Sequence, residues 1–332
     1  MKLKIIAVLA ITLISSAAVL ACDYCLLTQG ISPLETSRGI GFRLDERYTR
    51  LTTFLDNGRE IPNTGSIESH WTTQATAFWS VRPKLTLVAV VPVVRRLQDG
   101  PSSPTLPQPG GAAFGTGGPR YRQLHGDEEV NGTTFGLGDI SLVGRYQLFQ
   151  KHSLTSTFLG AVQAGIRLPT GSTHSKNDFG QYLDAHIQPG TGAVAYLFGA
   201  SFSYAKKRIT LVTNSFFSIP TEGNFGDTPY KFGKSVNYDA SLRYRLTKSI
   251  QSKAKFFASL GFAGDTRGKE KEDGQFLEDT GGTTFYFTPG FQIFYNQVIF
   301  EFSFWQPLGY NLNGEQLGET SKTLAGITFL LR

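Results

Sequence analysis

The chain has only two cysteines, Cys22 and Cys25, in the stretch ACDYCLLTQ. Four uses fit this spacing. The pair can form a disulfide in an oxidising compartment, Cys22 can carry a lipid after cleavage behind Ala21, the pair can bind a metal or exchange electrons, or neither thiol has a special role. A c-type haem is disfavoured because a histidine would have to follow the second cysteine, and residue 26 is leucine. Disulfide formation or lipidation are therefore the leading expectations.

Five histidines are the other residues that could serve as a base or a metal ligand. They are His70, His125, His152, His174 and His186. No two of them have the spacing of a metal site. His70, with Ser66 or Ser69 nearby, is the one candidate for a lipid hydrolase, but a nucleophile and its base need a convergent geometry that sequence neighbours do not show. We expect no catalytic residue, no metal and no cofactor.

Residues 1–21 have the form of an export signal. Lys2 and Lys4 precede an apolar run, and the segment ends in small residues at Ala21. No later stretch reaches the roughly 18 consecutive apolar residues of a membrane-spanning helix. We therefore expect an exported chain without a membrane helix, in which a periplasmic N-terminal segment, 22–37, carries the CxxC motif.

The composition favours β-structure with many turns. Charged residues make up only 17% of the chain and aromatic residues 13%, and there are 37 glycines. The formal charge is +6, of which the export signal supplies two. Such a small and dispersed surplus gives no reason to expect a nucleic-acid partner.

Apolar and polar residues alternate along almost the whole mature sequence. In VNYDASLRYRL, residues 236–246, every second residue is apolar or aromatic and those between are polar or charged. This period of two predicts strands, and we count twelve. The candidates are 38–50, 66–81, 84–96, 135–149, 153–168, 191–205, 208–219, 233–247, 250–264, 282–295, 297–308 and 320–331.

Alternation alone also fits a soluble sandwich, so the lengths of the connections decide the fold class. Short turns at 82–83, 150–152, 206–207, 248–249 and 296 alternate with longer connections at 51–65, 97–135, 169–190, 220–232, 265–281 and 309–319. This sidedness is typical of outer-membrane barrels, which have short periplasmic turns and long external loops. We predict an all-β transmembrane barrel of about 12 antiparallel strands over 38–332, in the bacterial outer membrane.

Lipid offers no partner to backbone N–H and C=O groups, so the sheet must close on itself. Apolar side chains then face lipid and polar ones face the lumen. The predicted lumen-lining residues are Asp139, Arg145, Gln163, Arg167, Asp239, Arg243, Arg245, Lys253, Lys255 and Glu301. We expect many of these charges to pair across strands, and their basic surplus favours anions or polarised solutes.

Two stretches resemble a known family. GLGDISLVGRYQL (136–148) and GIRLPTG (165–171), followed by IQPGTGA (187–193), are similar to the outer-membrane transporter family named for the MetA pathway of phenol degradation. These motifs cover about the middle quarter of the chain, and the strand layout extends the resemblance over most of the rest. We interpret Pro169, Gly171, Pro189 and Gly190 as an architectural rim motif, because proline removes a ladder donor where pairing stops.

The resemblance implies passive passage of small molecules, with hydrophobic or aromatic molecules as candidates, although the family name is not itself evidence for phenol. Twelve strands should leave a narrow path or a pocket, with loop 97–135 as a gate. The alternatives are a plugged structural or binding barrel that docks a periplasmic partner at its N-terminus, and a barrel-embedded lipid hydrolase. The expected partners are outer-membrane lipid and a small-molecule solute.

Overall fold

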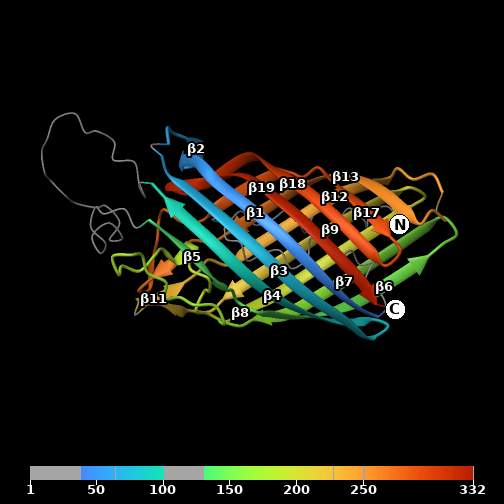
Figure 1. The fold of residues 1–332 in the computed structure, drawn as a ribbon, viewed down its shortest axis with the longest axis horizontal. Coiled ribbons are helices and arrows are strands. Elements are labelled where there is room, and N and C mark those ends of the chain that lie inside the picture. The colour runs from blue at the N-terminus through green and yellow to red at the C-terminus, as the bar shows by residue number, and fades with distance from the viewer. Residues whose placement is uncertain (1–38, 64, 101–130, 227, 250, 332) are drawn as a thin grey trace, which may run out of the picture.

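The alternating segments form strands that pair in one ring, shown in Figure 1. The structure, a computed structural model, describes residues 39–63, 65–100, 131–226, 228–249 and 251–331. Cys22 and Cys25, the export signal 1–21, the segment 22–37 and most of loop 97–135 lie outside the described residues, so what we expect of them stays a prediction.

Twelve strands form the wall of the barrel, and two of them are interrupted. They are β1 (Ile40–Asp56), β3 (Ile67–Arg82), β4 (Leu85–Asp99), β5 (Gly132–Leu137) continued by β6 (Ser141–His152), β7 (Ser156–Arg167), β8 (Ala195–Lys206), β9 (Ile209–Pro220), β12 (Ser235–Arg245), β13 (Ala254–Arg267), β16 (Gly282–Phe287) continued by β17 (Gly290–Tyr295), β18 (Val298–Leu312) and β19 (Glu315–Leu331). A short strand, β2 (Arg59–Glu60), pairs with the end of β1. The predicted count and antiparallel order are confirmed.

The first and last strands close the ring. β1 pairs antiparallel with β19 from Ile40 opposite Leu331 to Asp56 opposite Glu315, with a register irregularity next to Leu51. Each of the other spanning strands pairs with its neighbours along the chain. The barrel therefore has no open edge that would leave backbone groups unpaired in lipid.

The two faces of each strand meet different surroundings, as β12 shows. Leu242 and Tyr244 are 51% and 44% exposed on the outside, whereas Arg243 between them is largely buried inside. A slip of one residue would turn the arginine to lipid, at a cost of about 2–4 kcal/mol near the membrane midplane. The apolar exterior confirms the prediction of an outer-membrane barrel.

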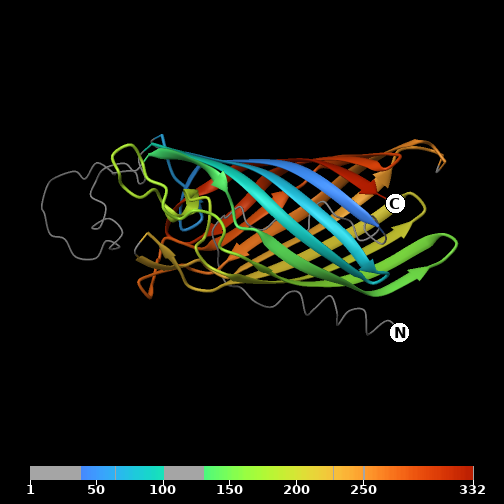
Figure 2. The same ribbon diagram turned by 60° about the horizontal axis from the view of Figure 1, so that its bottom comes forward.

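The connections are short at one end of the barrel and mostly long at the other, as Figure 2 shows. Trp79, Tyr204, Tyr244 and Tyr295 are exposed near the short-turn end, as expected for an interface girdle. One expectation is wrong: the region 309–319 is not a long loop. β18 and β19 extend into it and are joined by the two-residue turn 313–314, which is possible because Gly314 takes a φ of 54°.

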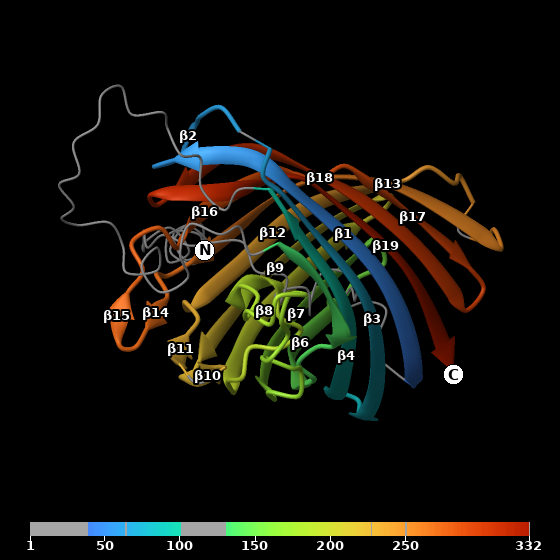
Figure 3. The same cartoon turned by 60° about the vertical axis from the view of Figure 1, so that its left-hand side comes forward.

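Three long connections meet at the external end. Four short strands pair there as a second sheet, β10 (Gly223–Phe225), β11 (Thr228–Lys231), β14 (Lys271–Glu272) and β15 (Gln275–Phe276), seen in Figure 3. The connection 168–194 adds a helical turn, η3 (Ala185–Ile187), whose Ala185 packs with Tyr230 and Phe232. No helix in the described part of the chain is long and apolar enough to span a membrane.

Candidate functional site

Ion pairs line one side of the barrel interior. Arg43 lies 2.6 Å from Asp45 (Nη2 to Oδ1) and 3.1 Å from Glu301 (Nη1 to Oε2). Glu301 also lies 4.0 Å from Arg243, which donates to Gln292 at 3.0 Å. Two of the predicted lumen residues, Arg243 and Glu301, thus come together in one network with two residues of β1.

The other predicted lumen residues are distributed around the ring. Asp239 accepts two hydrogen bonds from Asn214 Nδ2, at 3.2 and 3.0 Å. Arg145 lies opposite Gln163 in the β6–β7 ladder. Along the inward-facing rows, Arg245 ends β12 and Lys255 lies near the start of β13, and both are partly buried. Lys253, in contrast, precedes β13 and is exposed in the turn region.

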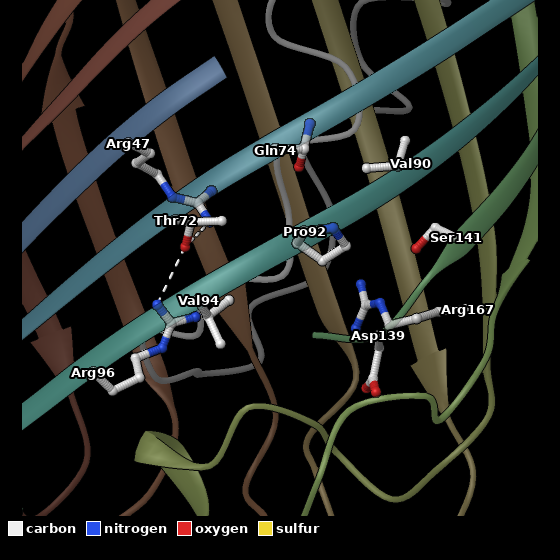
Figure 4. Close-up of a pocket in the computed structure, with 10 residues that line it drawn as sticks. All are labelled: Arg47, Thr72, Gln74, Val90, Pro92, Val94, Arg96, Asp139, Ser141 and Arg167. Carbon is white, nitrogen blue, oxygen red and sulfur yellow. Dashed lines mark hydrogen bonds between the residues drawn. The ribbon is translucent and has the colours of Figure 1, made fainter. Parts of the chain in front are cut away.

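A pocket opens in the inner wall formed by β1, β3, β4, β6 and β7, shown in Figure 4. Its empty space is about 360 Å³, including the part open to solvent. The lining residues are Arg47, Thr72, Gln74, Val90, Pro92, Val94, Arg96, Asp139, Ser141 and Arg167. Two predicted residues, Asp139 and Arg167, therefore share a pocket with two arginines that the sequence analysis did not select.

Two guanidinium groups of the pocket converge on one hydroxyl. Arg47 Nη2 donates to Thr72 Oγ1 at 3.3 Å, and Arg96 Nη1 donates to the same oxygen at 3.2 Å (Figure 4). Arg47 and Arg96 are 4% and 1% exposed. Three neighbouring strands, β1, β3 and β4, thus bring two cations and one neutral oxygen into contact.

Asp139 lies in the break between β5 and β6 rather than within a strand. Its Oδ1 accepts from the Gly171 N–H at 3.0 Å, and its Oδ2 accepts from the Thr191 N–H at 2.9 Å and the Thr191 hydroxyl at 2.6 Å. The carboxylate thereby joins both ends of connection 168–194 to the interrupted strand. We call this arrangement the rim clasp.

Glycines let the two parts of the rim motif touch. A Cβ atom built on Gly190 would lie 2.3 Å from the Gly171 carbonyl oxygen, and one built on Gly171 would lie 2.5 Å from Gly190 Cα. The ring of Pro189 lies beside Gly136 and its carbonyl oxygen beside Gly138, while Pro169 is exposed just beyond β7. The architecture of the clasp leaves no space for larger side chains at the two glycines.

The alternation of polar and apolar residues also marks three inward residues of β1 that were not among the predicted lumen residues, namely Arg43, Asp45 and Arg47. Asp45, Glu46 and Arg47 look like a break in the pattern, yet Asp45 and Arg47 continue the inward row from Arg43, and of these three residues only Glu46 faces outward. On the outer face, Glu46 accepts from Trp71 Nε1 at 2.6 Å and from the Thr73 hydroxyl at 2.9 Å. These hydrogen bonds satisfy the oxygens of the Glu46 carboxylate, which would otherwise be unfavourable on the outer face of a membrane strand.

A second cluster lies outside the membrane-spanning strands, where the external connections meet. His186 Nε2 lies 3.2 Å from Glu270 Oε2, and Tyr230 donates its phenolic proton to the same carboxylate. Burial lowers the pKa of His186, but the charge of Glu270, helped by their hydrogen bond and by Asp184 and Glu68, outweighs it and raises this pKa to about 10.

The raised pKa makes the cluster sensitive to alkali. An unfolded histidine loses its proton near pH 6.5, so the contribution of the His186–Glu270 pair to stability is full below that pH and falls until it is lost above about pH 10. We expect ¹³C-histidine NMR to show one imidazole titrating near pH 10, absent in His186→Gln. In Glu270→Gln the same resonance should titrate much lower; an unchanged midpoint would contradict the assignment.

The histidine on a spanning strand does not form a hydrolytic arrangement with its neighbour. His70 is buried with its Nε2 3.4 Å from Glu68 Oε2, and Ser69, the residue before it on β3, points to the opposite side. No group of three His, Cys, Asp or Glu side chains suited to a metal occurs among the residues that the structure describes.

Comparison with known proteins decides the family. The family model described as "Putative MetA-pathway of phenol degradation" matches residues 84–307, which is more than half of the chain. The chain belongs to this family. The predicted resemblance is confirmed, and the matched region of this MetA-pathway family member contains the whole rim clasp.

Solved structures agree with the fold of this MetA-pathway family member. The COG4313 outer membrane channel from Pseudomonas putida F1 aligns with a TM-score of 0.62 and 14% identity, covering 91% of this chain and 100% of that one. The CymD monoaromatic hydrocarbon channel scores 0.36 at 10% identity (96% and 95% covered), and a TodX monoaromatic hydrocarbon channel mutant scores 0.39 at 8% (89% and 91%). The TM-scores of CymD and TodX are below 0.5, so the fold comparison rests on the COG4313 channel. No curated protein matches the chain.

Proposed function

We propose that this protein is an outer-membrane channel for the passive passage of small molecules, with hydrophobic or aromatic molecules as candidates. The observation that carries the proposal is the closed ring with an apolar exterior and a polar interior. Membership of a family described by phenol degradation supports it, and the protein of matching fold from Pseudomonas putida is described as an outer membrane channel.

The interior supports a restricted path rather than a wide pore. Inward side chains such as Arg96 and Leu197 are almost completely buried, and inner ion pairs occupy the wall of β1, β12 and β18. A barrel of twelve strands is intermediate in width between the eight-stranded barrels, whose interior is filled by side chains, and the barrels of about sixteen strands, which contain an aqueous channel. Passage through such an interior would depend on specific side-chain contacts, and the proposal needs no catalytic group.

The same close filling favours one second candidate, a plugged structural or binding barrel. Conductance of the purified protein in planar bilayers separates the two. Steady channel openings, with a preference for anions because of the inward arginines, are expected for the channel. Silence at all voltages with correctly folded protein would support the plug, and a clear cation preference would contradict the role given to the arginines.

A further inference from the structure

The short-turn end of the barrel carries a strong positive charge. Four of its turns join β3 to β4, β6 to β7, β8 to β9 and β12 to β13. With the strand ends beside them they contribute Arg82, Lys84, Lys151, Lys206, Lys207, Arg208, Lys248 and Lys253, all of which are exposed except the half-buried Arg208. The segments that form these turns, 79–88, 144–158, 203–212 and 242–257, contain no aspartate or glutamate. The four turns therefore present charge of one sign.

These turns are contiguous around the barrel. Backbone hydrogen bonds join each to the next, from the Gln147 N–H to the Lys84 carbonyl at 2.8 Å, from the Lys207 N–H to the Thr155 carbonyl at 3.1 Å and from the Arg245 N–H to the Arg208 carbonyl at 2.8 Å. The external connections differ, because acidic residues accompany the basic ones there, as in the ion pair of Lys269 with Glu278. The two ends of the barrel are thus electrostatically unlike.

Beside these turns, the outer face carries a cluster of four aromatic rings. The ring of Phe158 on β7 lies 5.1 Å from that of Phe149 on β6, and 4.6 and 6.3 Å from those of Phe202 and Tyr204 on β8, measured between centroids. The hairpins β6–β7 and β8–β9, which carry the rings, are neighbours, as Figure 2 shows. We call these four residues the aromatic cluster. Outward aromatic rings near a strand end lie where acyl chains meet headgroups.

Two of the basic residues point to the same side as the aromatic cluster. Lys151 is directly opposite Phe158 in the β6–β7 ladder, and opposite residues of an antiparallel ladder share a face. Lys206 follows Tyr204 by two positions on β8, so it also points outward. Both lysines are exposed. A lysine whose stem lies along an apolar outer wall carries its ammonium group to the headgroups.

The position of these two lysines decides which anion they meet. They share the outer face with rings that contact acyl chains, so the nearest anion is one attached to such chains, the phosphate of a membrane lipid. Basic residues near a membrane surface attract anionic headgroups, and the turns offer no carboxylate to repel them. An acidic soluble partner would match the charge but not the aromatic cluster.

From this arrangement we infer that Lys151 and Lys206 bind the phosphate of an anionic glycerophospholipid, such as phosphatidylglycerol, whose acyl chains lie on the aromatic cluster. The other basic residues of the four turns add to the attraction. A zwitterionic lipid binds more weakly because its headgroup also carries a cation. The inference depends on the outer-membrane barrel and not on the channel function.

Native mass spectrometry of the full-length, detergent-folded protein measures the binding of single lipid molecules. The probes are phosphatidylglycerol and phosphatidylcholine with identical acyl chains. Lys151→Gln combined with Lys206→Gln removes both lysines of the site. The matched control is Lys176→Gln combined with Lys234→Gln, which removes the same charge from two exposed lysines of the external connections. Folding of each variant is checked by its heat-dependent gel mobility.

We expect the unmodified protein to bind phosphatidylglycerol at least about fivefold more tightly than phosphatidylcholine. One basic residue near a membrane surface contributes a factor of about five. Each of Lys151→Gln and Lys206→Gln should therefore weaken phosphatidylglycerol binding about fivefold, and the double variant on the order of 25-fold. The control pair should change it by less than about twofold, and arginine at both 151 and 206 should preserve it.

Equal affinity of the unmodified protein for the two lipids, or the same loss in the double variant as in the control pair, would overturn the inference. If the double variant fails to fold, the two single variants decide. A polyglutamate peptide tests the other class of partner. Binding of this peptide without any preference for phosphatidylglycerol would assign the turns to an acidic protein and overturn the lipid site. Displacement of the lipid by an equal concentration of glycerol phosphate would contradict the role of the aromatic cluster.

Discussion

Replacing Asp139 by alanine should lower the free energy of unfolding by about 4 kcal/mol, because a buried carboxylate that accepts three hydrogen bonds is removed. The N–H groups of Gly171 and Thr191 would lose their acceptor, and both ends of connection 168–194 would lose their attachment to the break between β5 and β6. Urea titration of the protein in lipid vesicles, followed by tryptophan fluorescence, measures the change.

Asp178→Ala is the control for this prediction. Asp178 belongs to the same connection but is exposed, so its loss should change the free energy of unfolding by no more than about 0.5 kcal/mol. Asp139→Asn should fall between the two, because the amide keeps one acceptor oxygen. If Asp139→Ala and Asp178→Ala unfolded at the same urea concentration, the rim clasp would not stabilise the barrel.

Replacing Arg43 by methionine should cost about 3–5 kcal/mol, the range expected when one partner of a buried ion pair is removed. Asp45 is only 6% exposed and Glu301 has little exposure, and both would lose the guanidinium group that lies 2.6 and 3.1 Å away. Two neighbouring carboxylates would then repel each other inside the barrel. The same urea titration measures this loss.

Arg50→Met provides the comparison, since Arg50 lies on the same strand but is exposed on the outer face. A triple variant, Arg43→Met with Asp45→Asn and Glu301→Gln, should recover part of the lost stability, because it removes the two carboxylates along with their partner. A loss in Arg43→Met no larger than in Arg50→Met would show that the inner ion pairs contribute nothing.

Alternation predicted the strand count, the ring and the face of most side chains because lipid and lumen impose opposite demands on successive residues. Its failures have local causes. Pairing can continue beyond the membrane, where alternation is no longer required, so the expected ends of β1, β13 and β18 fell short of the observed ones. Glu46 lies on the outer row, and its charge is accommodated there because Trp71 and Thr73 donate hydrogen bonds to it, which only the β1–β3 register reveals.

The candidate site was predictable in composition but not in detail. The sequence marks which residues face inward, yet the meeting of Arg47, Thr72 and Arg96 depends on the stagger of three strands. The pairing of His186 with Glu270 depends on which external connections become neighbours around the ring. The connection expected at 265–281 thus supplies a buried carboxylate, that of Glu270, because the connection that carries His186 covers it.

The pairing of β1 with β19 has a consequence for the biogenesis of the protein. The seam joins the two most distant strands of the chain, so the cylinder is completed only after synthesis of the final strand has finished. Until then, both partners of the seam expose hydrogen-bonding edges that can aggregate. A topology with so many long-range contacts is expected to mature slowly, and a nascent chain that stops before β19 would need an escort to stay soluble on its way to the membrane.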